Sequence, residues 1–190
     1  MIKRLIAVLV CCVAFAGVAQ AENFTLLQVS VFHPVQLFDQ TETVRGIRLN
    51  AIYGVNEDVG GIDVGLVNKV TGVVRGVQIG LVNLVDGDAS GFEYGLVNIV
   101  GGSVTGYQAG VFNTVHGNFK GIQSGWINNV NGEFAGLQAG YFWNYATEIR
   151  GVQIGLVNSA GKLHGVQLGI LNFTSHANPA GFLPIINAAY

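Results

Sequence analysis

The chain is poor in charged residues, and this shortage narrows the classes of protein to which it can belong. Charged residues make up 11% of the sequence, whereas about a quarter is usual in soluble domains. The shortage is typical of a tightly stacked repeat protein or of a chain embedded in a membrane. Lysine and arginine number 9 against 11 acidic residues. No basic stripe is present, which argues against nucleic acid as a partner.

Cysteine is equally scarce, and its position predicts export. The two cysteines, Cys11 and Cys12, fall inside an apolar stretch over 5–18 that follows two basic residues. Residues 19–21 read Ala-Gln-Ala, a small-x-small cleavage site. We therefore expect a signal peptide over 1–21 and a mature chain that begins at Glu22. That mature chain has no thiol, which excludes disulfides and thiol chemistry.

The sequence also lacks the patterns that carry catalysis. It contains no serine–histidine–acid set, no phosphate loop and no G-x-G-x-x-G fingerprint. No pair of histidines has the spacing of metal ligands; the four are His33, His116, His164 and His176. The acidic pair Glu57-Asp58 is interpreted as a solvated turn. We predict no catalytic, cofactor-binding or metal-ligating residues, no cofactor, and a protein that is not an enzyme.

What the chain has in abundance is glycine at a fixed period. One glycine recurs every fifteen residues, and the last comes one residue early: Gly46, Gly61, Gly76, Gly91, Gly106, Gly121, Gly136, Gly151 and Gly165. A fixed period indicates a repeat architecture in which one unit stacks on copies of itself. The repeats cover 46–172. We expect an N-terminal capping strand region over 22–45 and a C-terminal capping strand over 173–190, because the end units must cover exposed edges.

Within each unit the residues alternate with the period of a β-strand. With the recurring glycine as position 1, positions 2, 6, 7, 10 and 14 are apolar, position 3 is polar, and position 5 is glycine in all units but the first. Alternation with many β-branched residues predicts strands, and frequent glycine argues against helices. The fold class is therefore all-β.

The favoured architecture is a parallel β-solenoid of about nine 15-residue coils with atypical capping ends. If the even positions point inward, the interior is largely apolar and the variable polar positions lie outside. Identical positions then stack about 4.8 Å apart. Asparagine at position 8 is expected to form a structural amide ladder, from Asn68, Asn83, Asn98, Asn113, Asn128, Asn158 and Asn172.

On this reading, position 3 forms a polar stripe on the surface. Its members are Arg48, Asp63, Gln78, Glu93, Gln108, Gln123, Gln138, Gln153 and Gln167. Arg48 and Asp63 would stack as a surface ion pair contributing about 0–1 kcal/mol.

The alternative is an antiparallel meander closed as an outer-membrane β-barrel, in which the position-3 residues would face the lumen. Asp-Gly, Asn-Gly and Gly-Gly pairs between units are strong hairpin signals, and a tilted strand of about 9–11 residues spans a bilayer. A strictly regular meander accumulates no stagger between strands, however, whereas a closed barrel needs a definite shear. This difference favours the solenoid.

Residues 76–83, 121–128 and 151–158 share the pattern G-x-Q-x-G-φ-φ-N, φ being apolar. In this pattern the chain resembles bacterial surface repeat-containing proteins. The resemblance implies a protein exported to the bacterial cell surface or outer membrane, and it brings no catalytic residues. We expect a non-enzymatic structural or binding scaffold whose partners are an outer-membrane or cell-surface component or another copy of itself. The alternative is a membrane-embedded barrel that acts as a small channel or anchor.

Overall fold

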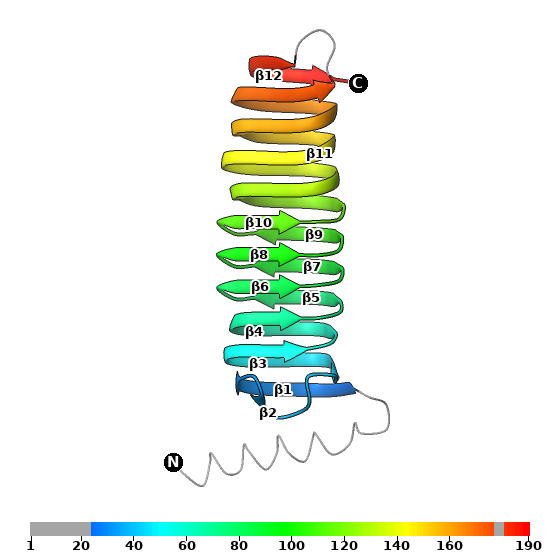
Figure 1. Cartoon of the computed structure of the whole chain (residues 1–190), viewed down its shortest axis with the longest axis vertical. Coiled ribbons are helices and arrows are strands. Elements are labelled where there is room, and N and C mark those ends of the chain that lie inside the picture. Colours follow the sequence, from blue (N-terminus) through cyan, green and yellow to red (C-terminus); the bar gives the residue numbers. More distant parts are fainter. Residues whose placement is uncertain (1–23, 177–180) are drawn as a thin grey trace.

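Over its described residues the protein is a rod of β-structure, as seen in a computed structural model (Figure 1). The structure describes residues 24–176 and 181–190, so the expected signal peptide lies outside the described residues. The strands are β1 (Phe24–Phe32), β2 (Val35–Gln36), β3 (Thr43–Asn56), β4 (Val59–Val70), β5 (Val74–Ile79), β6 (Val82–Val85), β7 (Ala89–Tyr94), β8 (Val97–Val100), β9 (Val104–Ala109), β10 (Phe112–Val115), β11 (Phe119–His176) and β12 (Phe182–Ala189).

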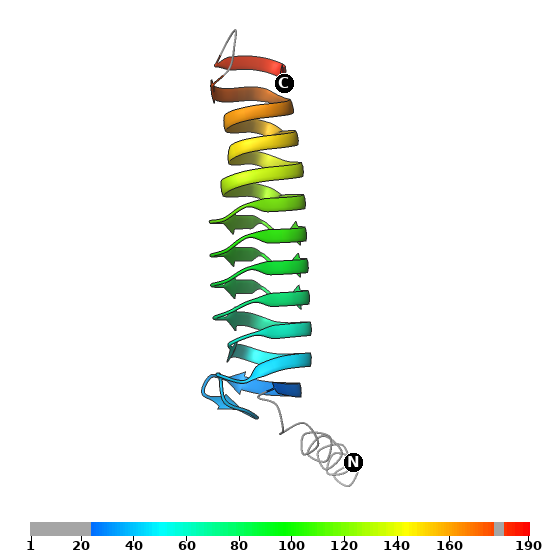
Figure 2. The ribbon, with the colours of Figure 1, turned by 90° about the vertical axis from the view of Figure 1, so that its right-hand side faces the viewer.

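The repeats pair in parallel, each residue with its equivalent one unit later. Gly76 of β5 pairs with Gly91 of β7, and Asn83 of β6 pairs with Asn98 of β8. Strands β5, β7 and β9 stack in one layer and β6, β8 and β10 in the other (Figures 1 and 2). The parallel β-solenoid is therefore confirmed. The antiparallel meander is wrong, and the channel function that depended on it loses its structural basis.

The recurring glycine at position 1 is required by the backbone. From Gly61 to Gly165 this glycine adopts φ between +121° and +148°, a region that residues with a Cβ rarely occupy. The coils also approach closely there: a Cβ on Gly61 would overlap the carbonyl oxygen of Gly46, and the same holds from coil to coil. The strict period of glycine is thus a condition for stacking the coils.

The prediction that the even positions point inward is wrong over half of each coil. In the coil 76–90, Gln78 and Asn83 are buried, while Ile79 and Leu81 are exposed. The reason is the odd number of residues in each coil, which determines which positions share a face. Fifteen is odd, so the strand that buries position 14 also turns positions 1, 3 and 5 inward and positions 2 and 4 outward. Side chains at positions 6 and 7 both point outward at a corner, after which positions 8 and 10 are buried.

The apolar core is consequently narrow and lies on one side of the rod. It is formed by positions 10 and 14, with Ala146 and Leu163 displaced by one residue: Val44, Val59, Val70, Val74, Val85, Ala89, Val100, Val104, Val115, Phe119, Val130, Phe134, Ala146, Ile149, Ala160 and Leu163. Beside this core, the chain turns at positions 11–13. There Asp88 Oδ1 accepts a hydrogen bond from the backbone N–H of Ser103 in the next coil, at 2.7 Å. Polar turn side chains therefore help to tie neighbouring coils together.

Both ends of the stack carry strands that depart from the repeat. At the N-terminal end β1 pairs in parallel with β3 and antiparallel with β2. At the other end β12 pairs antiparallel with β11, with Gly165 opposite Ala189. These strands cover the sheet edges that the regular coils would leave open.

Candidate functional surface

The polar position-3 residues line the inside of the rod. Each exposes 3% or less of its surface: Arg48, Asp63, Gln78, Glu93, Gln108, Gln123, Gln138, Gln153 and Gln167. The predicted surface stripe is therefore wrong, and so is the lumen that was its alternative. This column of residues, here called the glutamine column, packs against its own copies in the coils above and below.

Hydrogen bonds between side chains satisfy most of the glutamine column. The Nε2 of each glutamine donates to the side chain one coil earlier, as Gln123 does to Gln108 at 2.8 Å and Gln138 to Gln123 at 2.9 Å. At the C-terminal end Asn187 of β12 donates to Gln167 Oε1 at 2.9 Å. A buried amide without a partner costs about 1–3 kcal/mol, so this ladder is what makes a polar interior stable.

Arg48 and Asp63 form a buried ion pair, not the surface pair expected from their spacing. Their side chains are fully buried, and two hydrogen bonds join them, at 2.8 Å from Nε and 2.6 Å from Nη2. The Asp63 carboxylate also accepts hydrogen bonds from Asn50 at 3.2 Å and Gln78 at 2.8 Å. The pair thus begins the ladder that the glutamines continue.

The ladder has one gap, between Gln78 and Glu93. These two residues are register partners in β5 and β7, yet Gln78 Oε1 and Glu93 Oε1 both lack a hydrogen-bond partner. Burial raises the pKa of Glu93 to about 7, although the hydrogen bond that it accepts from Gln108 acts in the opposite direction. A proton on the Glu93 carboxyl would supply the donor that two facing acceptors need.

The asparagines of position 8 form a second buried ladder, in agreement with the prediction. Asn83 Nδ2 donates to Asn98 Oδ1 at 2.8 Å, and Asn98 donates in the same way to Asn113. The full ladder joins Asn68, Asn83, Asn98, Asn113, Asn128, Asn158 and Asn172 with two further members. Most members also donate to a backbone carbonyl, as Asn83 Nδ2 donates to the carbonyl oxygen of Tyr94 at 3.0 Å.

The two further members, Asn50 and Asn144, were missed by counting from glycine. Asn50 stands at position 5, but its Nδ2 donates to Asn68 Oδ1 at 2.8 Å. Asn144 is one residue late, at position 9 of a coil that still has fifteen residues, and it joins Asn128 to Asn158. The signal was an asparagine close to each unit that lacks one at position 8. Counting strictly from the glycine discarded it.

Because the interior holds the amides, the apolar residues of positions 2, 4, 6 and 7 lie outside. We call this exposed set the apolar band. It contains no charged residue from Ile47 to Leu171. Its well-exposed members are Ile47, Leu49, Ile52, Ile62, Val64, Leu66, Ile79, Leu81, Phe92, Tyr94, Leu96, Tyr107, Phe112, Ile122, Trp126, Tyr141, Phe142, Trp143, Ile154, Leu156, Leu168, Ile170 and Leu171.

The size of the band exceeds that of incidental surface patches. At about 4.8 Å per coil it runs roughly 40 Å along the rod, and its width is roughly 15–20 Å. The resulting area, on the order of 600–800 Å², lies above the roughly 300–600 Å² of the largest patch on a typical monomer. Such a surface is expected to be covered by something other than water.

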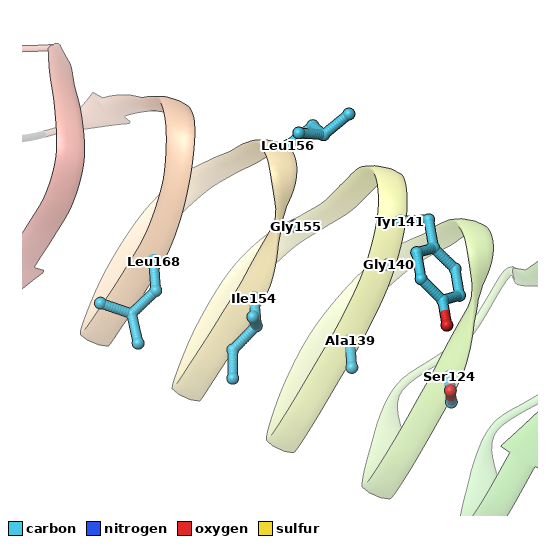
Figure 3. Close-up of a pocket in the computed structure, with 8 residues that line it drawn as sticks. All are labelled: Ser124, Ala139, Gly140, Tyr141, Ile154, Gly155, Leu156 and Leu168. Carbon is cyan, nitrogen blue, oxygen red and sulfur yellow. The ribbon is translucent and has the colours of Figure 1, made fainter.

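A shallow groove interrupts the band where position 4 holds small residues. Its volume is about 380 Å³, and it is lined by Ser124, Ala139, Gly140, Tyr141, Ile154, Gly155, Leu156 and Leu168. Figure 3 shows the short side chains of Ala139 and Ser124 in one row with the larger Ile154 and Leu168, on successive coils, with Tyr141 above Ser124. The groove offers one hydroxyl group from Ser124 and another from Tyr141, and is otherwise suited to an apolar group.

Charged side chains on the outside are largely sorted by sign, with two exceptions: Lys69 at position 9, which pairs with Asp86, and Lys162 at position 12. Position 15, which borders the band, holds Arg45, Arg75, Lys120 and Arg150 and no acidic residue. Arg150 pairs with Glu133 and Glu148. Among the described residues, Arg75 and Lys120 form no ion pair. The acidic residues on the outside of the repeats gather at the opposite edge, at positions 11–13, where Glu57, Asp86 and Asp88 are exposed and Asp58, Glu133 and Glu148 are partly buried.

Within the described part of the chain, no three histidine, cysteine, aspartate or glutamate residues lie close enough together to hold a metal ion. The side chain of His176 lies outside the described residues. Over the same residues no helix is long and apolar enough to cross a membrane. Comparisons with protein-family models, curated proteins and solved structures found no match. The surface itself must therefore suggest the function.

Proposed function

We propose that this protein is a non-enzymatic scaffold, exported to the bacterial cell surface or outer membrane, that binds a surface component through its apolar band. The observation that carries the proposal is that polar side chains fill much of the interior while many apolar side chains point outward. The polar side chains of positions 3 and 8 are used inside the rod to hold the coils together, which leaves an apolar exterior free for contact.

The rod suits a scaffold because each coil repeats the same contacts. Stability is then close to a sum of local terms between neighbouring coils, and the exterior presents the same apolar pattern at every step. Large exposed apolar surfaces in proteins mark contacts with other proteins or with membranes. Export is supported by the sequence of residues 1–21 alone.

The proposal is tested by expressing the full chain with a C-terminal epitope in a Gram-negative bacterium and fractionating the cells. We expect the epitope in the envelope fraction, with the N-terminus of the isolated protein at Glu22. A matched variant, Leu81→Glu with Leu96→Glu, should be exported and processed equally but be released from the envelope. Retention of residues 1–21 on a cytoplasmic protein would refute export, and equal envelope retention of the variant would refute binding through the band.

A further inference from the structure

The apolar band has the shape and the charge pattern of a lipid-docking edge. We propose that the rod lies along an anionic phospholipid surface, with the band in the acyl region and the cations of position 15 among the headgroups. This inference rests on the proposed function, since it names the surface component that the band binds.

The first argument is the convex shape of the band. Positions 2 and 4 lie on the layer formed by β5, β7 and β9, whereas position 7 lies on the layer formed by β6, β8 and β10. Position 6 joins the two at the corner, where Leu81 is 48% exposed and Leu96 54% exposed. A flat partner, such as a second copy of the rod, covers one layer and leaves the other exposed to water. A fluid lipid surface covers both layers and the corner together.

The second argument is the order of charges around the rod. Next to the uncharged band stand the position-15 cations, of which Arg75 and Lys120 have no acidic partner in the described structure. The acidic residues on the outside lie at positions 11–13, on the edge farthest from the band, where Glu133 and Glu148 pair with Arg150 and Asp86 and Asp88 are exposed. Long basic side chains at the border of an apolar surface reach toward phosphate groups while their stems stay in the apolar region. This order favours an anionic lipid surface and keeps the acidic side chains in water.

The same order fixes the orientation of the rod. Both the band and the acidic edge run the length of the repeats, so a rod that crossed the bilayer would carry Asp86 and Asp88 into hydrocarbon. Charged groups at the bilayer centre are costly. A rod whose axis lies parallel to the surface inserts only the band, as interfacial amphipathic helices insert one face. The groove beside Tyr141 then opens toward the acyl chains and accommodates one of them.

The test is flotation of the purified exported protein with vesicles of phosphatidylcholine alone or of phosphatidylcholine with 30% phosphatidylglycerol. We expect the wild type to float with both and to bind the anionic vesicles more tightly. Arg75→Gln with Lys120→Gln should weaken binding to anionic vesicles by about fivefold per residue and leave binding to neutral vesicles unchanged. The band variant Leu81→Glu with Leu96→Glu should lose binding to both vesicle types.

A matched variant, Thr71→Glu with Asn131→Glu, places the same two charges on the far edge, and circular dichroism checks that every variant keeps the wild-type fold. The proposal is supported if this control floats with the vesicles and only the band variant loses vesicle binding. Equal loss of vesicle binding in both variants overturns it. Failure of the folded wild type to float with either vesicle also overturns it. If that protein is still exported and held in the envelope, the scaffold function survives and the partner is not lipid.

Discussion

Replacing Glu93 with glutamine should stabilise the rod at neutral and alkaline pH. Glu93 is buried in the glutamine column next to its register partner Gln78, and the Oε1 atom of each residue lacks a hydrogen-bond partner. A glutamine there would donate its amide to Gln78, as Gln123 donates to Gln108, and would still accept from Gln108. The substitution thus completes the ladder without a proton.

The magnitude follows from the pKa of the buried carboxyl. Its pKa rises from 4.5 to about 7 on burial, so the folded chain holds the proton more tightly than the unfolded chain does. The stabilisation is therefore complete below about pH 4.5 and is lost as the pH rises through about 7. At about 1.4 kcal/mol per pH unit, the loss amounts to about 3 kcal/mol of unfolding free energy.

The assay is urea unfolding followed by circular dichroism at about pH 5 and about pH 8.5, with Glu57→Gln as an exposed control. The wild type and the control should lose about 2–3 kcal/mol more than Glu93→Gln between the two pH values. The difference between the proteins is what is compared, because it cancels any pH dependence that they share. The reasoning is refuted if Glu93→Gln loses as much stability as the wild type over this interval.

Three further substitutions test the interior by urea unfolding of the purified protein. Asp63→Gln should cost about 3–5 kcal/mol, because Arg48 then lies buried without its carboxylate, and Arg48→Gln added to it should restore most of the loss by extending the amide ladder; no recovery in the double variant would contradict the ladder. Gly61→Ala should cost about 3 kcal/mol or more through its positive φ and the overlap with the adjacent coil, whereas Gly60→Ala, whose Cβ would lie 3.8 Å from the nearest atom, should cost little; equal costs would contradict the backbone argument. Asn98→Ala should cost about 2–3 kcal/mol by leaving ladder partners unsatisfied, and a neutral effect would show that the asparagine ladder is dispensable.

The period, the strands and the parallel stacking were all predictable from the sequence. Glycine at strict fifteen-residue spacing fixed the register, and the odd number of residues per coil determines the parity of the inward positions. The asparagine ladder was predictable as well, since an identical polar residue at one position stacks on itself. Asn50 and Asn144 were missed because they stand at positions 5 and 9, although their side chains still reach the ladder partners.

The inside and outside of the first strand were not predictable from hydrophobicity. A rule that places apolar side chains inward assigns Ile122 to the core and Gln123 to water, and the structure reverses both. The reversal is stable because each glutamine finds its partner one coil away, a contact that no single repeat contains. For the same reason, the apolar band could not be predicted while its residues were assigned to the core.

The burial of the glutamines and the exposure of their apolar neighbours are tested most directly by measuring the accessibility of two neighbouring side chains. Ile122→Cys and Gln123→Cys, each with Cys11 and Cys12 changed to serine, are treated with a water-soluble maleimide in the absence of lipid, and circular dichroism confirms that both stay folded. Ile122 is 43% exposed and Gln123 is fully buried, so we predict rapid labelling at 122 and labelling at 123 only after unfolding. Rapid labelling at 123 with protection at 122 would contradict the account.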